Sequence, residues 1–259
     1  MSGLLLITGG ASGIGAAVAR LAAPRGFAIA INYRSRRAAA DALVSELAAL
    51  GATARAFQAD VSRPHDVEKL YEDVQRELGR PTAVLNSAGI APPAIRVANA
   101  SADALEQLLR VNVLGVMLSC REAARAMSIQ SGGSGGVVIN VSSMAATIGG
   151  RPGNSHYAAS KAAVDAFSVG FAKEVAAEGI RVVSVRPGFT ITDMTRHRLD
   201  DERFRRVIAE TIPLGRPARV EEVAAPIAWL LSSDASFITG ACLDISGGGF
   251  AIADAPRER

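Results

Sequence analysis

Short apolar runs recur along the chain, and each is followed by a longer stretch in which apolar residues repeat every three to four positions. Within the runs, apolar residues are consecutive and often β-branched, which is typical of parallel strands buried on both faces. Seven such strands are predicted, over residues 4–8, 28–33, 53–58, 83–86, 137–142, 181–186 and 242–245. An antiparallel sheet with one wet face would instead show alternating apolar and polar residues.

The intervening stretches predict helices, because they are rich in alanine and carry apolar residues at helical spacing. They cover residues 13–25, 37–50, 64–78, 102–126, 155–178 and 220–231. Strands and helices that alternate in this way form an α/β, doubly wound sheet with helices on both faces. We therefore predict one domain over residues 1–259, a Rossmann fold with a seven-stranded, mainly parallel sheet.

Two regions lack a clear helix or strand pattern. Residues 131–136 read as a glycine and serine loop, and residues 188–217 contain many arginines. We predict that residues 189–217 form a flexible flap and that residues 251–259 are frayed. Trp229 is flanked by apolar residues and is expected in the core.

Composition excludes several classes of protein. The chain is 49% hydrophobic and 20% charged, which suits a packed core and is unlike a disordered chain. Its apolar runs are too short to span a bilayer and no basic segment precedes the first run, so we expect a cytoplasmic protein without a membrane segment. The formal net charge is only +3 and the basic residues are scattered, which argues against nucleic-acid binding.

Cysteine and histidine usage predicts neither a disulfide framework nor a metal site. Cys120 and Cys242 lie in unrelated contexts, and the spacing of His65, His156 and His197 does not match a set of metal ligands. We therefore expect two buried free thiols and no bound metal.

A glycine-rich run follows the first predicted strand and opens the first predicted helix. Residues 8–15 read T-G-G-A-S-G-I-G. In this position glycine allows a tight turn and a close approach to a pyrophosphate, while the free amides and the positive end of the helix dipole favour negative charge. The alternative is a tight turn without a ligand. Because no Lys-Ser or Lys-Thr pair follows the glycines, a nucleoside triphosphate loop is not supported, and the sequence predicts a bound dinucleotide.

The end of the second strand indicates which dinucleotide binds. An NAD site needs a carboxylate there for the ribose hydroxyls, but residues 31–37 read I-N-Y-R-S-R-R and contain no acid. A guanidinium complements a 2′-phosphate, so NADP(H) is preferred over NAD(H). Arg34 is the first candidate, with Ser35 assisting, and Arg36 and Arg37 remain open. Alternatively, these arginines only solvate the start of a helix.

With these motifs in order, residues 4–249 resemble the short-chain dehydrogenase/reductase family in its one-domain form. Residues 8–15 match the family's cofactor loop, T-G-x-x-x-G-x-G. Asp60 and Val61 resemble its adenine contact after the third strand. Residues 86–89 read N-S-A-G and resemble its N-N-A-G segment, from which Ser87 departs.

The same resemblance implies a catalytic set. Ser143, Tyr157 and Lys161 fit the family pattern S…Y-x-x-x-K, and Asn112 resembles the helix asparagine that keeps a water near the lysine. Ser142 is adjacent, but the second serine of such a pair reaches the substrate oxygen in the family. Residues 187–194, P-G-F-T-I-T-D-M, resemble the stretch that holds the nicotinamide carboxamide.

Together, the residue patterns and the resemblance predict the cofactor-binding set Gly9, Ser12, Gly13, Ile14, Gly15, Arg34, Ser35, Asp60, Val61, Asn86, Ala88, Gly89, Tyr157, Lys161, Pro187, Gly188, Thr190 and Thr192. The resemblance also implies a homotetramer with contacts through residues 102–126, 155–178 and 247–250.

The spacing of Tyr157 and Lys161 suits proton transfer. Residues four apart on a helix lie on the same face, so the ammonium can reach toward the phenol. One positive charge at about 4 Å contributes about 4 kcal/mol at an effective dielectric near 20, which would bring a phenol pKa from about 10 to near 7. In reduction, Tyr157 would protonate the forming alkoxide while Ser143 donates to the same oxygen and the nicotinamide supplies hydride.

Two other functional classes remain open: a catalytically silent NADPH sensor and a structural assembly protein. The four catalytic-type residues argue against the sensor, and the glycine loop argues against the structural protein. For an enzyme, the small-molecule substrate could be a 3-oxoacyl thioester, a sugar, or a small ketone or alcohol. We expect residues 91–97, 147–156 and the flap after residue 192 to select it.

Overall fold

The computed structural model describes residues 3–193 and 195–249. The predicted frayed tail, 251–259, lies outside this part of the chain. The sheet contains β1 (Gly3–Thr8), β2 (Phe27–Tyr33), β3 (Ala54–Gln58), β4 (Ala83–Asn86), β5 (Gly136–Val141), β6 (Ile180–Pro187) and β7 (Ala241–Ile245). The strand order is β3-β2-β1-β4-β5-β6-β7, and every pairing is parallel. The predicted seven-stranded parallel sheet is confirmed.

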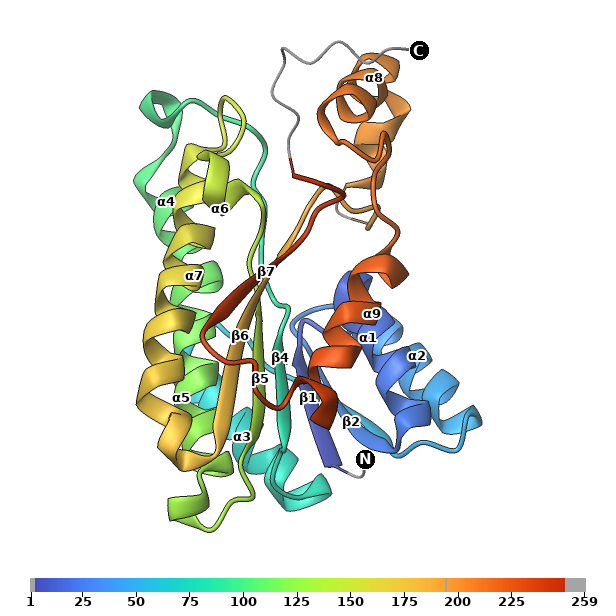
Figure 1. Cartoon of the computed structure of the whole chain (residues 1–259), viewed down its shortest axis with the longest axis vertical. Helices are drawn as coiled ribbons and strands as arrows, with labels where there is room; N and C mark the ends of the chain where they lie inside the picture. The colour runs from blue at the N-terminus through green and yellow to red at the C-terminus, as the bar shows by residue number, and fades with distance from the viewer. Residues whose placement is uncertain (1–2, 194, 250–259) are drawn as a thin grey trace.

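Helices cover both faces of the sheet (Figure 1). On one face lie α1 (Gly13–Ala22), α2 (Arg37–Ala49) and α9 (Val220–Leu230). On the other face lie α3 (Pro64–Leu78), α4 (Ala102–Leu109), α5 (Gly115–Met127) and α7 (Ser155–Val175). Each face has its own cluster of fully buried aliphatic side chains, such as Ile29 on one face and Val84 on the other. Burial on both faces explains why the strand residues are apolar without alternation.

Short helical turns connect these elements. They are η1 (Ala23–Arg25), η2 (Val97–Asn99), η4 (Ile129–Ser131), α6 (Ala145–Ile148), η5 (Ala176–Glu178), η6 (Arg196–Asp200) and η7 (Ser233–Ala235). None of the helices in the described ranges is long and apolar enough to cross a membrane.

The structure differs from the sequence prediction in three elements of the fold, and Cys242, expected to be buried, is only partly buried. The helix predicted over 102–126 is interrupted by η3, a π-helical turn over Arg110–Leu114. The region 188–217, predicted to lack regular structure, contains helix α8 (Glu202–Thr211), which lies beyond the carboxyl edge of the sheet (Figure 1). Trp229 is not in the core, since 41% of its surface is exposed.

Each difference has a physical reason. Helix α8 buries only Ile208 and half of its residues are charged, so its composition matches the arginine-rich loop around it more than that of the alanine-rich helices. The π turn inserts a residue without changing composition, so spacing alone cannot reveal it. Neighbouring residues of a helix point in different directions, and in α9 Ala228 and Leu230 take the buried positions on either side of Trp229 in the sequence.

Candidate active site

A cavity of about 790 Å³ lies at the carboxyl edge of the sheet. Residues just beyond β1, β2, β4 and β6 line it, and β1 and β4 are the neighbours at which the strand order reverses. In open α/β sheets, ligands bind in the crevice at this reversal. The volume suits a ligand the size of a dinucleotide fragment with a small substrate.

The glycine run forms a tight turn between β1 and α1. Gly9 has φ +64°, and a Cβ there would lie 2.7 Å from the Cα of Ala88, so only glycine fits. The amide of Gly10 donates to the Asn32 carbonyl at 2.9 Å, which ties the turn to β2. Because α1 begins at Gly13, the unpaired amides of its first turn lie at the cavity wall.

The structure separates the three arginines after β2. Arg34 and Arg36 line the cavity, whereas Arg37 does not; its side chain is 76% exposed and pairs with Asp41 at 3.5 Å. The Nη1 of Arg36 donates to Asp193 Oδ2 at 2.8 Å and to the Oγ of Ser12 at 3.2 Å. Arg36 therefore connects the glycine turn to the segment after β6.

Asp60 lies near Arg34 at the same wall. Its Oδ1 accepts hydrogen bonds from the backbone N and the Oγ of Ser62, at 3.0 and 2.7 Å. Burial raises the pKa of Asp60, but the Ser62 hydrogen bonds and the charges of Arg34 and Arg63 outweigh burial, so this pKa lies below its ordinary value. The carboxylate stays ionised and can accept a donor from a ligand.

Asn86 lies beneath the cavity wall and not on it. Its Nδ2 donates to Asn140 Oδ1 at 2.8 Å, and Asn140 in turn donates to the Oγ of Ser168 at 2.9 Å. This buried network joins β4, β5 and α7. The residues that follow Asn86, from Ser87 to Gly89, reach the cavity.

Asn112 sits in the π turn and is fully buried. Its Oδ1 accepts from the amide of Ile90 at 2.8 Å, and its Nδ2 donates to the carbonyl of Ile90 at 2.9 Å. A Cβ on Gly89 would meet Asn112 Oδ1 at 3.3 Å and Lys161 Nζ at 3.5 Å, so both groups lie beside Gly89. Asn112 thus holds the segment after β4 next to the lysine, and its water-holding role stays a prediction.

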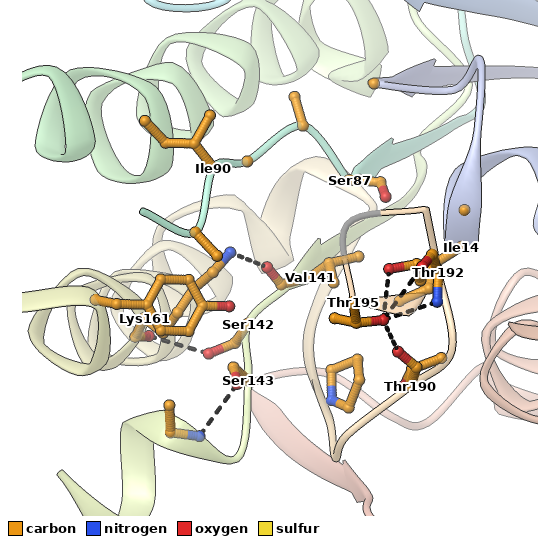
Figure 2. Close-up of a pocket in the computed structure, with 18 of the residues that line it drawn as sticks. Ile14, Ser87, Ile90, Val141, Ser142, Ser143, Lys161, Thr190, Thr192 and Thr195 are labelled. Atoms are coloured by element: carbon orange, nitrogen blue, oxygen red, sulfur yellow. Dashed lines mark hydrogen bonds between the residues drawn. The ribbon is translucent and has the colours of Figure 1, made fainter. Parts of the chain in front are cut away.

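Tyr157 and Lys161 occupy one face of α7, as the spacing predicts. The Nζ of Lys161 donates to the Val141 carbonyl at 2.9 Å (Figure 2) and lies 6.0 Å from the centroid of the Tyr157 ring. The lysine is only 5% exposed. Burial lowers its pKa to about 8, although the charge of Asp165, one turn further along α7, opposes that shift.

The pKa expected for Tyr157 is wrong for this structure. Burial raises the pKa of the phenol above its ordinary value, and a hydrogen bond with Ser143 counters burial only in part. The ammonium of Lys161 is directed at Val141, so it does not offset the desolvation of the ring hydroxyl. Tyr157 is therefore protonated at neutral pH.

The two adjacent serines take different roles. The Oγ of Ser142 is buried and donates to the Lys161 carbonyl at 3.0 Å, so it anchors β5 to α7. The Oγ of Ser143 accepts from the Ala145 amide at 3.1 Å and also bonds Tyr157. Of the pair, Ser143 is the one that shares a hydrogen bond with the phenol.

Three threonines form the wall that faces Lys161 across the cavity (Figure 2). Thr195 Oγ1 donates to the Thr190 carbonyl at 2.6 Å, accepts from the Thr192 amide at 2.9 Å and lies 3.1 Å from Thr192 Oγ1. Thr190 and Thr192 are predicted site residues. Thr195 was missed, because its spacing from the other two has meaning only once the segment turns back on itself.

Most predicted site residues meet at this cavity. Those that do not line it are Gly15, Asn86 and Asn112. Gly15 packs in α1 against the turn, where a Cβ would lie 3.0 Å from the Gly9 carbonyl. Arg151, before α7, and Arg198, in η6, also line the cavity. They lie in residues 147–156 and in the flap after residue 192, the regions expected to select the substrate, although neither was predicted individually as a site residue.

Comparison with known proteins agrees with this geometry. A family model described as "Enoyl-(Acyl carrier protein) reductase" matches residues 9–249. The chain is 40% identical over 245 residues to "Uncharacterized oxidoreductase YgfF" of Escherichia coli K12, covering 95% of this chain and 99% of that protein. It is 39% identical over 248 residues to the 3-oxoacyl-[acyl-carrier-protein] reductase of Homo sapiens, covering 96% and 98% respectively.

Solved structures agree as well. A short-chain type dehydrogenase/reductase from Mycobacterium ulcerans superposes with a TM-score of 0.89 at 30% identity, covering 96% of this chain and 91% of that one. A blue fluorescent protein from a metagenomic library, in complex with NADPH, superposes with a TM-score of 0.87 at 34% identity, covering 98% of each chain. The chain belongs to the short-chain dehydrogenase/reductase family of oxidoreductases.

Proposed function

We propose that this protein is an NADP(H)-dependent oxidoreductase that interconverts carbonyl compounds and alcohols, with Tyr157 as the acid/base group. The proposal rests on the convergence of Ser143, Tyr157 and Lys161 on a cavity that also contains a glycine turn at a helix N-terminus. A protein that only sensed the cofactor would not need these three side chains together. The convergence therefore favours an enzyme over a silent sensor.

The residues present fit a dinucleotide phosphate. Gly9 leaves space that a Cβ would fill, and the α1 N-terminus offers amide donors for a pyrophosphate. Arg34 and Arg36 are the guanidinium groups at the wall, so they are the candidates for a 2′-phosphate, while Arg37 is directed away. The NADPH complex of the fluorescent relative supports the same preference. When bound, the cofactor supplies or accepts a hydride.

Each side chain of the site has its own part in the proton transfer. In reduction, the hydroxyl of Tyr157 gives its proton to the carbonyl oxygen as the carbon receives hydride, and the product is an alcohol. Ser143 donates a hydrogen bond to the same oxygen and stabilises its developing charge. Lys161 is the cation for the resulting tyrosinate, a role that requires its ammonium to turn from the Val141 carbonyl toward the phenol oxygen. Asn112 keeps the wall after β4 in place around Lys161.

The protonated phenol is the form that the reduction step requires. A proton donor must hold its proton at working pH, and burial keeps Tyr157 protonated. The printed names of the relatives support a 3-oxoacyl thioester as the carbonyl compound, with sugars and small ketones as alternatives.

We further propose a cytoplasmic homotetramer. Leu109 and Met117 are 48% and 37% exposed, and both lie in the region 102–126 that was predicted to form contacts. Sedimentation velocity at micromolar concentration tests the assembly, and a single monomeric species would contradict it.

A panel assay tests the function. The protein is incubated with NADPH or NADH and with carbonyl compounds from each substrate class, and loss of reduced-nicotinamide absorbance is followed. Turnover with NADPH that exceeds turnover with NADH is the expected result. Tight NADPH binding without turnover of any carbonyl or alcohol would instead support a sensor.

A further inference from the structure

Arg151 is a half-buried cation with only neutral partners. It lies in the loop between α6 and α7 and lines the cavity. Its Nη2 donates to Thr211 Oγ1 at 3.3 Å, and its guanidinium carbon lies 5.6 Å from the centroid of the Phe204 ring. Within the described residues, no carboxylate forms an ion pair with it. By contrast Arg186, a half-buried cation on β6, pairs with Asp165 at 2.7 Å.

A second cation, Arg198, lines the same cavity as Arg151. Burial lowers the pKa of Arg151, and the positive charge of Arg198 lowers it further. Arg198 comes from η6 and also lines the cavity. Two like charges that line one cavity repel each other, and an anion bound between them would relieve that repulsion.

The surrounding wall offers no such anion. We call the lining residues of segments 90–94, 144–154 and 197–212 the distal wall; among those described, none is an acid. The acids that line the rest of the cavity are engaged elsewhere, Asp60 with Ser62 and Asp193 with Arg36. Apolar side chains also line this part of the cavity, among them Met144, Ile148, Ile208 and Ile212.

The position of Arg151 is held from both sides. The carbonyl of Gly153 accepts from the Ile95 amide at 2.9 Å, so its loop is attached to the segment after β4. The ring under the guanidinium, Phe204, packs edge-on against Phe189 with centroids 5.2 Å apart. A guanidinium fixed in this way loses little entropy when it binds a ligand.

We propose that the substrate carries, besides the reacting carbonyl, an anionic group that Arg151 and Arg198 bind at the distal wall. A carboxylate or a phosphate fits, because the planar guanidinium binds either through paired hydrogen bonds. The part of the substrate between the two groups is apolar and contacts the apolar residues of the distal wall. The inference rests on the proposed function, since it places the carbonyl at Tyr157.

Matched pairs of substrates test this proposal. Oxo-carboxylic acids of increasing chain length are compared with their methyl esters, with NADPH as reductant. The best acid should exceed its ester in kcat/KM by about ten-fold or more, mainly through KM. Arg151→Gln should bring that ratio close to one, and Arg151→Lys should restore part of it. Arg206→Gln removes an exposed arginine on α8 that does not line the cavity, and should leave the ratio unchanged.

A second pair distinguishes the source of the anion. A 3-oxoacyl coenzyme A thioester carries phosphates, whereas the N-acetylcysteamine thioester of the same acyl group carries none. If the phosphate of a carrier arm is the ligand, Arg151→Gln lowers the preference for the coenzyme A thioester and leaves the ratio of acid to ester unaffected. If a substrate carboxylate is the ligand, Arg151→Gln lowers the ratio of acid to ester and leaves the preference for the coenzyme A thioester unaffected. Either result supports an anion site.

Calorimetry separates failure of this inference from failure of the proposed function. The oxo-acid and its ester are titrated into the NADPH-loaded wild-type protein and the Arg151→Gln variant. Binding of the acid alone, lost in the variant, supports the anion site even if no carbonyl is reduced. The inference would be overturned if acid and ester, and likewise the two thioesters, gave equal kinetics and equal binding in both proteins. That result would leave the reductase proposal standing.

Discussion

The two parts of the cavity wall differ in how their charges are compensated. Around the glycine turn, each cation has a carboxylate nearby: Arg36 contacts Asp193, and the charge of Arg34 lowers the pKa of Asp60. At the distal wall, Arg151 faces Arg198. The first part is built at the ends of strands and the second from loops and α8. The strand ends provide a balanced site for the common cofactor, whereas the loops provide an uncompensated charge that can select a substrate.

The largest expected effect comes from the group between these two parts. Tyr157→Phe should lower kcat by about 10²–10⁴-fold, because it removes the proton donor. NADPH affinity, measured by fluorescence titration, should remain near the wild-type value. The control is Tyr71→Phe, which removes a hydroxyl that bonds the Ser119 carbonyl far from the cavity and should retain turnover. Equal activity of Tyr157→Phe and wild type would remove the acid/base assignment.

The next largest effect concerns the part of the cavity wall around the glycine turn. Gly9→Ala should weaken NADPH binding by at least about ten-fold and lower Tm, since its Cβ would lie 2.7 Å from Ala88 and φ is +64°. Gly51→Ala is a matched control, because Gly51 has φ +80° but no atom within 4 Å of the added Cβ. Both variants should lose some stability, but only Gly9→Ala should lose cofactor affinity. Identical titration curves for the two variants would contradict this role.

A smaller effect is expected for cofactor choice. Arg34→Ala should reduce the preference for NADPH over NADH by about ten-fold, the value of one charge-assisted hydrogen bond. Arg37→Ala is the control, because that side chain is exposed and outside the cavity. The ratio of kcat/KM for the two cofactors is the measurement. A preference that changes only in the Arg37 variant would reverse the assignment.

The smallest effect is a shift in pH dependence. The pKa of Lys161 is about 8, so the ammonium is lost as pH rises through that value, and reductase activity should fall with it. Asp165 raises this pKa, so Asp165→Asn should move the falling limb to lower pH by a fraction of a unit. Asp165→Glu keeps the charge and should restore the profile. If the falling limb of the pH profile does not move in an Asp165→Asn variant with wild-type Tm, the charge of Asp165 does not control the pKa of Lys161.

The lowered pKa of Lys161 should also make the free energy of unfolding depend on pH. The Lys161 pKa falls from 10.5 in the unfolded chain to about 8 in the folded protein, so between these values the unfolded chain binds more protons. The contribution of Lys161 to the free energy of unfolding therefore rises with pH over that interval. Urea unfolding of wild type and Lys161→Met at two pH values within and below the interval measures this contribution, and a slope of opposite sign would contradict the assigned pKa.

Sequence reasoning succeeded where chemistry follows from local spacing. The Tyr157 and Lys161 pair follows from helix periodicity, and the glycine turn follows from its place between a strand and a helix. Residue spacing could not predict which of Arg34, Arg36 and Arg37 reaches the cavity, because successive side chains after a strand point in different directions. It assigned substrate selection to the regions that contain Arg151 and Arg198 but could not single out these two side chains, because their shared place at the cavity depends on two loops 47 positions apart in the sequence.

The amino-acid sequence by itself determined the parallel sheet, the order of its elements, the glycine turn and the spacing of Tyr157 and Lys161, because each follows from residue patterns that are local in the sequence. Only the tertiary structure decided the pKa of Tyr157, the π turn that buries Asn112 and the pairing of like charges at the distal wall. Burial and long-range electrostatics depend on which distant segments pack together, and residue spacing does not encode that packing.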